Sequence, residues 1–193
     1  MSLISIHKLN QKIDFHRVRK NTFSLKKDCF GQLFHPYPEV FFGVDQTHFH
    51  FYARHQETAL IHPNAREGDF QAELWKYDVA EFFLAAPDRS QYLEFNLAPN
   101  GAWWSCFFSA PRKTSRTKPL AGVSTQAKVT LDDWQVHAAI PLTEIPWPLE
   151  ECFLNATFIL KSPDQQFLTL TDLGGDQPDF HRPAHFLAIS LSS

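Results

Sequence analysis

The chain has 193 residues, a formal net charge of −3 and 44% hydrophobic residues. A chain of this length and composition is typical of one globular domain, so residues 1–193 are predicted to form a single unit. The sequence has no basic stripe and no run of 18 apolar residues, which excludes nucleic acid and a membrane as expected partners.

Strands are favoured along the whole chain. Aromatic residues make up 15% of the sequence, and flat rings pack well on a pleated surface. Thirteen prolines interrupt most windows that could form a stable helix. The first two predicted strands are residues 40–44 and 48–53, joined by a turn at Asp45. In the second strand, Phe49 and Phe51 share one face while His48 and His50 share the other.

Further short apolar runs follow, separated by turn residues. Pro87 and the sequence Pro99-Asn100-Gly101 divide the first three of them into a meander. A basic cluster from Arg112 to Lys118 is interpreted as a solvated loop, and residues 143–148 as at most a short helical turn. The remaining predicted strands are residues 79–85, 92–97, 103–108, two strands within 128–140, 153–161, 167–170 and 186–191.

The predicted fold class is therefore all-β. Roughly nine or ten short strands at regular spacing indicate an antiparallel β-sandwich of jelly-roll or immunoglobulin-like character, with little helix.

The cysteines Cys29, Cys106 and Cys152 are odd in number and widely spaced, which does not describe a disulfide framework. Free thiols are expected in a reducing compartment, and residues 1–10 contain no apolar run of signal-peptide length. The sequence as it stands is therefore expected to be cytoplasmic. Nothing in the sequence indicates the oligomeric state.

No metal ion or other cofactor is expected. The pair His48-x-His50, with His55 and His62 nearby, could bind a metal, but solvated histidines are the commoner case. Met1 is the only methionine, which excludes haem ligation by a Met/His pair.

The segment from Trp75 to Trp104 carries the candidate site. Asp78 and Glu81 follow Trp75 by three and six residues, and Glu94 alternates with Asn96 on a later strand. A buried, unpaired carboxylate costs several kcal/mol, so Glu81 must have a partner or face a cleft. An aromatic ring beside carboxylates is a way to hold a sugar, because the ring stacks on the C–H face while acids and amides bind the hydroxyls.

Structural interpretations of the same residues stay open. Trp75 could cap the core, Asp78 could bind backbone N–H groups in a turn, and Glu81 could pair with an arginine such as Arg182. Glu94 could lie on the solvated face of an edge strand. Two functional alternatives also remain: a glycoside hydrolase-like enzyme that uses Glu81 and Glu94, whose carboxyl groups would need a set separation, and a purely structural or interaction domain.

The pattern Trp75-x-x-Asp78-x-x-Glu81-Phe82 resembles the "W-x-x-D-x-V-E-x-F" signature of family 9 carbohydrate-binding modules and the related DOMON-type domains. Four further segments resemble later parts of that family in the same order, and together they cover about residues 38–191. These segments are Tyr92-Leu93-Glu94-Phe95-Asn96-x-x-Pro99-x-Gly101, Trp134-x-Val136-x-Ala138-x-Ile140-Pro141, the strand containing Asn155, and Pro178-x-Phe180-His181-x-Pro183-x-x-Phe186.

The resemblance implies a β-sandwich and a non-catalytic module that binds a mono- or oligosaccharide. In the sugar-binding members two aromatic rings clamp a terminal sugar, and Trp75 matches the first ring while Glu81 matches a carboxylate that binds hydroxyls. The second ring is normally a C-terminal Trp, and the nearest residues here are Phe180 and His181. Calcium, which some members bind, is not expected because no matching acidic loop is present. The predicted ligand-binding residues are Trp75, Asp78, Glu81, Glu94, Asn96, Phe180 and His181.

Overall fold

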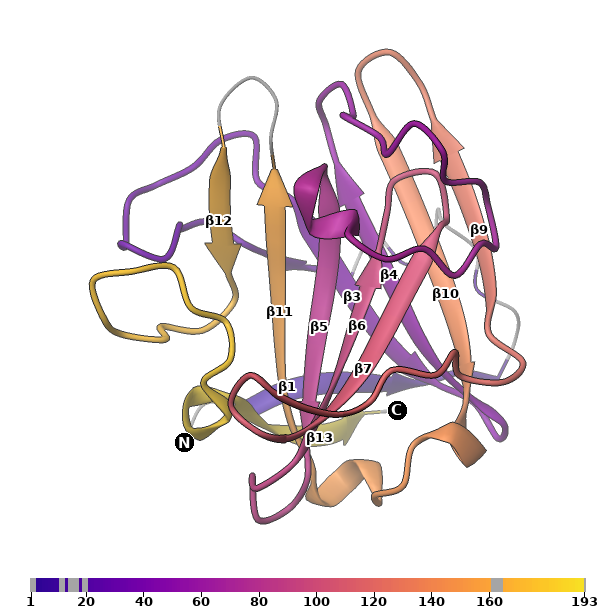
Figure 1. Ribbon diagram of the computed structural model, residues 1–193, viewed down its shortest axis with the longest axis vertical. Helices are drawn as coiled ribbons and strands as arrows, with labels where there is room; N and C mark the ends of the chain where they lie inside the picture. The colour runs from indigo at the N-terminus through magenta and orange to yellow at the C-terminus, as the bar shows by residue number, and fades with distance from the viewer. Residues whose placement is uncertain (1–2, 11–12, 14–17, 19–20, 161–164, 193) are drawn as a thin grey trace.

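The computed structural model describes residues 3–10, 13, 18, 21–160 and 165–192, and nearly all of its regular structure is β-strand (Figure 1). Within these ranges, no helix is long and apolar enough to cross a bilayer. Four short 3-10 turns are present: η1 (Leu74–Lys76), η2 (Leu142–Glu144), η3 (Leu149–Glu151) and η4 (Pro183–His185). The thirteen strands in the described part are β1 (Leu3–Lys8), β2 (Phe23–Ser24), β3 (Glu39–Val44), β4 (His48–His55), β5 (Val79–Ala85), β6 (Tyr92–Leu97), β7 (Trp103–Ala110), β8 (Lys113–Arg116), β9 (Ser124–Val129), β10 (Trp134–Pro141), β11 (Phe153–Leu160), β12 (Gln166–Thr169) and β13 (Leu187–Ser192).

All strands belong to one mixed sheet. Its order is β8-β7-β6-β5-β11-β13-β1-β3-β4-β10-β9, with β12 beside β11 and β2 beside β3. Most pairs are antiparallel, but β1 runs parallel to both β13 and β3. The all-β prediction is confirmed. The expected count of nine or ten strands and the wholly antiparallel pairing were wrong.

The strands missed by the sequence analysis are β1, β2 and β8. β8 falls in the basic cluster that was interpreted as a loop, and every one of its residues is exposed because it forms an edge of the sheet. A strand without a buried face shows no alternation of apolar and polar residues. The missing alternation explains why the sequence pattern favoured a loop there.

The predicted strands from residue 40 onward are confirmed with ends that differ by a few residues, except that the first strand expected within residues 128–140 begins earlier, as β9, and reaches only Val129. The turn between β3 and β4 is held by Asp45, whose carboxylate accepts the N–H groups of Thr47 and His48 at 2.7 Å. The expected helical turn near residue 143 is η2. Residue Lys161, the predicted end of its strand, lies outside the described residues.

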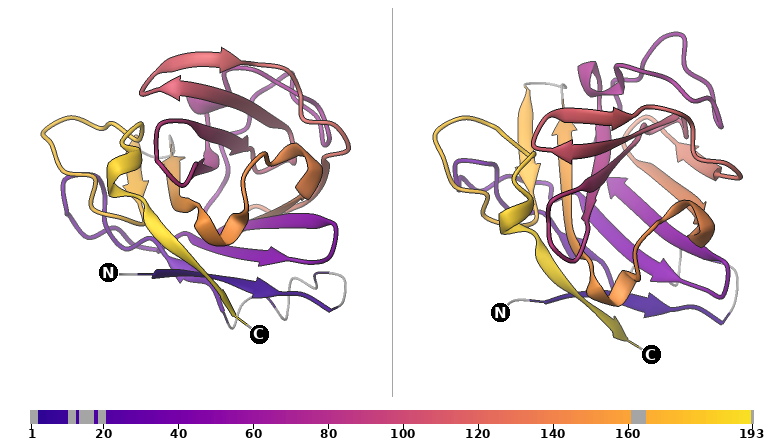
Figure 2. Two further views of the ribbon diagram at one scale, coloured as in Figure 1. Left: turned by 90° about the horizontal axis from the view of Figure 1, so that it is seen from below. Right: turned by 60° about the horizontal axis from the view of Figure 1, so that its bottom comes forward.

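The main core lies where the curled sheet faces itself. The ring of Phe82 on β5 contacts the rings of Phe42, Phe49 and Phe51 on β3 and β4, with centroids 5.2–6.3 Å apart. Since β5 is far from β3 and β4 in the strand order, these contacts require the sheet to curl into two facing layers. Figure 2 shows this curl from two further directions.

Alternation along β5 sends its side chains to opposite sides, as the sequence predicted. Phe82 and its even-numbered neighbours point into the main core, while Phe83 packs in a second apolar cluster on the outer side. We call this outer side of β5, β6, β7 and β11 the site face. Its central side chains include Glu81, Glu94, Trp104 and Thr157.

Candidate functional site

A cavity of about 560 Å³ opens on the site face. Five of the predicted ligand-binding residues line it: Trp75, Glu81, Glu94, Phe180 and His181. Most of the other lining residues are apolar, and we call the rings around the cavity the aromatic lining. The aromatic lining consists of Trp75, Phe83, Trp104, Phe108, Phe167 and Phe180.

Trp75 lies in η1, directly before β5. Its neighbour Leu74 is buried in the second apolar cluster and fixes the turn to the domain. The Trp75 side chain is therefore turned outward, and the residue is 51% exposed. The Nζ atom of Lys76 lies 5.5 Å from the centre of the Trp75 ring. A half-exposed indole at the mouth of a cavity is available to stack on a ligand.

Glu81 and Glu94, which we call the carboxyl pair, lie on adjacent strands. Glu81 stands opposite Asn96 and Glu94 opposite Phe83, so the two acids are diagonal neighbours on one face. Such neighbours lie within reach of each other, at about 7–8 Å between Cα atoms. The hydroxyl of Thr157 donates a hydrogen bond of 2.9 Å to Glu81.

Burial keeps the carboxyl pair partly protonated at neutral pH. It raises the pKa of Glu81 well above the usual value, and the charge of Glu94 adds to this effect. Burial also raises the pKa of Glu94 to about 7, although the Asn96 amide and the Arg112 charge act in the opposite direction. Desolvation disfavours the ionised form of any buried acid.

The suggested ion pair between Glu81 and Arg182 is wrong. The Arg182 guanidinium donates to the carbonyl oxygens of Leu173 and Gly174 and lies 3.6 Å from Asp179. These contacts hold the guanidinium in the loop between β12 and η4, where it binds backbone carbonyl groups and does not line the cavity.

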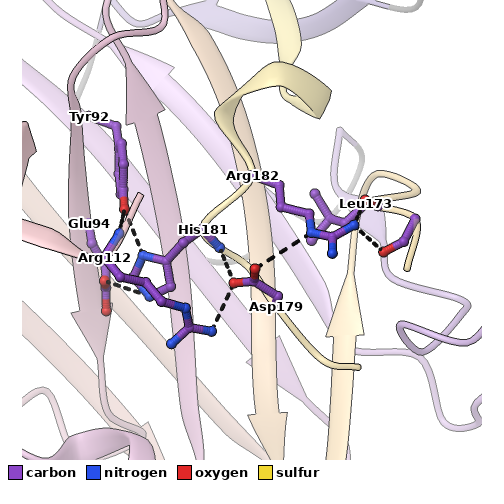
Figure 3. Close-up of polar contacts among 8 residues, drawn as sticks. Tyr92, Glu94, Arg112, Leu173, Asp179, His181 and Arg182 are labelled. Carbon is purple, nitrogen blue, oxygen red and sulfur yellow. Dashed lines mark hydrogen bonds and ion pairs between the residues drawn. The ribbon is translucent and has the colours of Figure 1, made fainter. Parts of the chain in front are cut away.

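His181 belongs to a polar network at the wall of the cavity (Figure 3). The Tyr92 hydroxyl accepts the backbone N–H of Arg112 at 3.1 Å and lies 2.8 Å from Nδ1 of His181. The Tyr92 hydroxyl therefore joins the Arg112 N–H to the His181 ring. The other ring nitrogen of His181, Nε2, lies 3.9 Å from a carboxylate oxygen of Glu94. Burial, followed by the charge of Arg112, lowers the pKa of His181 to about 4, so the ring is neutral at pH 7.

Two predicted residues lie beside the cavity without lining it. The Asp78 carboxylate accepts the N–H of Leu60 at 2.8 Å, and its own N–H donates to the Leu60 carbonyl at 2.9 Å. Asp78 therefore fastens the preceding loop to the start of β5. Asn96 is 1% exposed, and its side-chain oxygen has no hydrogen-bond partner.

Phe180 forms a wall of the cavity. It is 8% exposed, and its ring lies 6.2 Å from that of Phe83 and 6.3 Å from that of Phe167. A ring packed in this way offers an edge or one face to a ligand rather than a free platform. Trp104, half-buried on β7 opposite Asn96, is a second indole in the lining.

Trp104 and Arg112 line the cavity but were not predicted as site residues from the sequence. Trp104 follows from the register, because a turn at Pro99-Asn100-Gly101 pairs Asn96 with Trp104 and places their side chains on one face. Arg112 had no such signal. It lies outside a strand at φ 59°, and an ion pair of 2.8 Å with Asp179 holds it at the cavity.

Both ring nitrogens of His50 on β4 have partners within the protein. His50 contacts the Asp45 carboxylate through Nε2 at 2.9 Å and His137 through Nδ1 at 3.0 Å. In the part of the chain that the structure describes, no group of three or more His, Cys, Asp or Glu side chains is arranged to hold a metal ion.

The fold is that of carbohydrate-binding modules. A candidate carbohydrate-binding protein from Bacteroides uniformis superposes with a TM-score of 0.72 at 14% identity, over 98% of each chain. A family 9 carbohydrate-binding module from Caldicellulosiruptor kristjanssonii in complex with glucose gives 0.66 at 14% identity, over 99% of this chain and 96% of that one. Its complex with cellotriose gives 0.64 at 13% identity, over 97% and 93%.

No family model and no curated protein matches the sequence. Identities of 13–14% show a shared fold and do not transfer a ligand. The resemblance to family 9 modules is thus confirmed for the fold, while the resemblance to DOMON-type domains stays a prediction.

Proposed function

We propose that residues 1–193 form one sandwich-type, jelly-roll-like module that binds a mono- or oligosaccharide without transforming it. The observation that carries this proposal is the cavity on the site face, where an exposed indole and a buried carboxyl pair meet. Concave sites with mostly apolar walls and a few convergent polar groups are typical of ligand binding. The solved structures with this fold include one with glucose and one with cellotriose.

Each wall of the cavity has a role in the proposal. Trp75 is the stacking platform, because its ring is half-exposed at the mouth. Glu81 and Glu94 supply acceptors for hydroxyl groups, Asn96 supports Glu94 through its side-chain amide, and His181 offers a ring nitrogen. Phe180 closes the opposite side as an apolar wall. Asp78 supports the site by fixing the loop that leads into η1.

The arrangement of the carboxyl pair favours holding over hydrolysis. Glycosidases place their two carboxyl groups on either side of the scissile bond. Glu81 and Glu94 lie on neighbouring strands of the same sheet face, and Glu81 is 2% exposed beneath the cavity. Both can therefore accept hydrogen bonds from hydroxyl groups on one side of a sugar.

The test is calorimetric titration with glucose and cellotriose at millimolar concentrations. The intact chain is expected to bind at least one of them, and Trp75→Ala is expected to weaken binding by tenfold or more. Trp147→Phe is the matched control, because Trp147 packs on Phe107 outside the cavity, and this variant should bind normally. No binding of either sugar, or equal affinity for the Trp75 variant, would refute the proposal.

A further inference from the structure

The charges around the cavity do not balance. The exposed Glu73 is matched by Lys76, whose Nζ lies 2.6 Å away. Arg112 is matched by Asp179 at 2.8 Å. His181 is neutral, since its pKa is lowered to about 4. The carboxyl pair has no ion pair with a Lys or Arg among the described residues, and the one cation whose charge reaches it, Arg112, is shared with Asp179.

The polar floor of the site is also short of hydrogen-bond donors. Apart from the protons that the two acids retain, Glu81 receives one donor, the Thr157 hydroxyl, and Glu94 receives the Asn96 amide. The side-chain oxygens of Asn96 and Asn155 are buried and have no partner. Asn96 stands directly opposite Glu81 in the sheet, so its free oxygen lies beside the carboxyl pair. A buried acceptor without a donor is costly and calls for a complementary group.

The walls suit a positive charge as well. The aromatic lining surrounds the cavity, and ring faces attract cations, most strongly when water is excluded. An ammonium group carries three donors and no acceptor, which matches a floor made of acceptors. Three features of the cavity therefore fit the same chemical group: an acid pair without an ion pair to Lys or Arg, buried acceptors without a protein donor, and aromatic walls.

We propose that the preferred ligand is an amino sugar whose ammonium group binds between Glu81 and Glu94. This inference rests on the proposed sugar-binding function and specifies its ligand class. When the ammonium group binds between two protonated carboxyl groups, one of these carboxyl groups ionises and releases its proton to the solvent. The new contact is a charge-assisted hydrogen bond, and no bond within the sugar changes.

The test compares glucosamine with glucose, which differ by an amine in place of one hydroxyl, by calorimetry at pH 6. Glucosamine is expected to bind about tenfold more tightly, since charged hydrogen bonds are about twice as strong as neutral ones. Titrations in two buffers of different ionisation enthalpy should show release of up to one proton with glucosamine and none with glucose. N-acetylglucosamine, which keeps the nitrogen but lacks the charge, should show neither effect.

Substitutions test whether the preference for glucosamine over glucose depends on the carboxyl pair. Glu94→Gln and Glu81→Gln are each expected to reduce the ratio of glucosamine to glucose affinity from about ten to near one. Glu73→Gln is the matched control, because Glu73 lines the same cavity but is exposed and paired with Lys76, and it should keep the ratio. If glucose binds and glucosamine binds no better, the inference is wrong while sugar binding stands. If no sugar binds, the proposed function fails as well.

Discussion

Replacing Glu94 with glutamine is expected to stabilise the protein at neutral and alkaline pH. Glutamine fills nearly the same volume and keeps a hydrogen-bonding side chain, but it cannot ionise. In the wild-type chain the folded state retains a proton on Glu94 that the unfolded state has already released. This contribution to stability is complete below pH 4.5 and is lost as the pH rises through about 7. Over that range the free energy of unfolding of the wild type therefore decreases relative to that of the variant.

The size of this change follows from the pKa. A rise of the Glu94 pKa from 4.5 to about 7 corresponds to about 3 kcal/mol, because each pKa unit is worth about 1.36 kcal/mol. Glu94 is 7% exposed, so solvent screening removes little of this figure. In a domain of this size about 3 kcal/mol shifts the melting temperature by about 6–12 °C.

Urea denaturation of both proteins at intervals from pH 4 to pH 8.5 measures the effect. The difference in the free energy of unfolding, variant minus wild type, should increase by about 3 kcal/mol across this range. Taking the difference removes the titration of the histidines, which both chains share. Glu57→Gln, at an exposed position outside the cavity, is the control for replacing a carboxylate by an amide elsewhere on the chain. A constant difference for the Glu94 variant would refute the burial argument.

Three further substitutions test the surroundings of the site. Asp78→Ala is expected to lower the free energy of unfolding by about 1–3 kcal/mol in urea, since it leaves the Leu60 N–H without its acceptor. Phe82→Ala is expected to cost about 3–5 kcal/mol in the same assay, because the ring is fully buried between the two layers. Tyr92→Phe removes the hydroxyl that joins the Arg112 N–H to His181, so it should cost about 1 kcal/mol and speed hydrogen exchange at the Arg112 amide.

The sequence was sufficient for the strands that have an alternating pattern. On β4 the alternation of Phe49 and Phe51 with His48 reports directly which side faces the core. Both sides of β5 are buried, so there the spacing of two residues separates Phe82 from Glu81 and Phe83 but does not by itself say which side is the main core. β1 carries the same kind of pattern, with Ile4 and Ile6 buried, but its partner β13 lies at the far end of the chain. Neighbouring sequence contains no signal for a parallel pairing between the first and last strands.

Half of the candidate site could be predicted, because it is local. Trp75 and Glu81 lie within one turn and one strand, and Glu94 follows in the next strand. The other wall depends on the loop between β12 and η4, which is placed by contacts such as Arg112 with Asp179, 67 residues apart. Contacts at that separation leave no periodic pattern, so the sequence could name Phe180 and His181 only through a family resemblance.

The carboxyl pair gives a physical reason to regard the cavity as a site rather than as a packing defect. Glutamine at both positions would fill the same space, form comparable hydrogen bonds and escape the cost of ionising in an apolar surrounding. The chain instead holds two acids, one of them 2% exposed, and no Lys or Arg among the described residues forms an ion pair with either. Such an arrangement lowers stability at neutral pH, and strongly perturbed carboxyl groups in a cleft are typical of functional sites. The same feature that weakens the free protein is the one that would recognise a donor-rich ligand, so stability and binding should respond in opposite directions when either acid is neutralised.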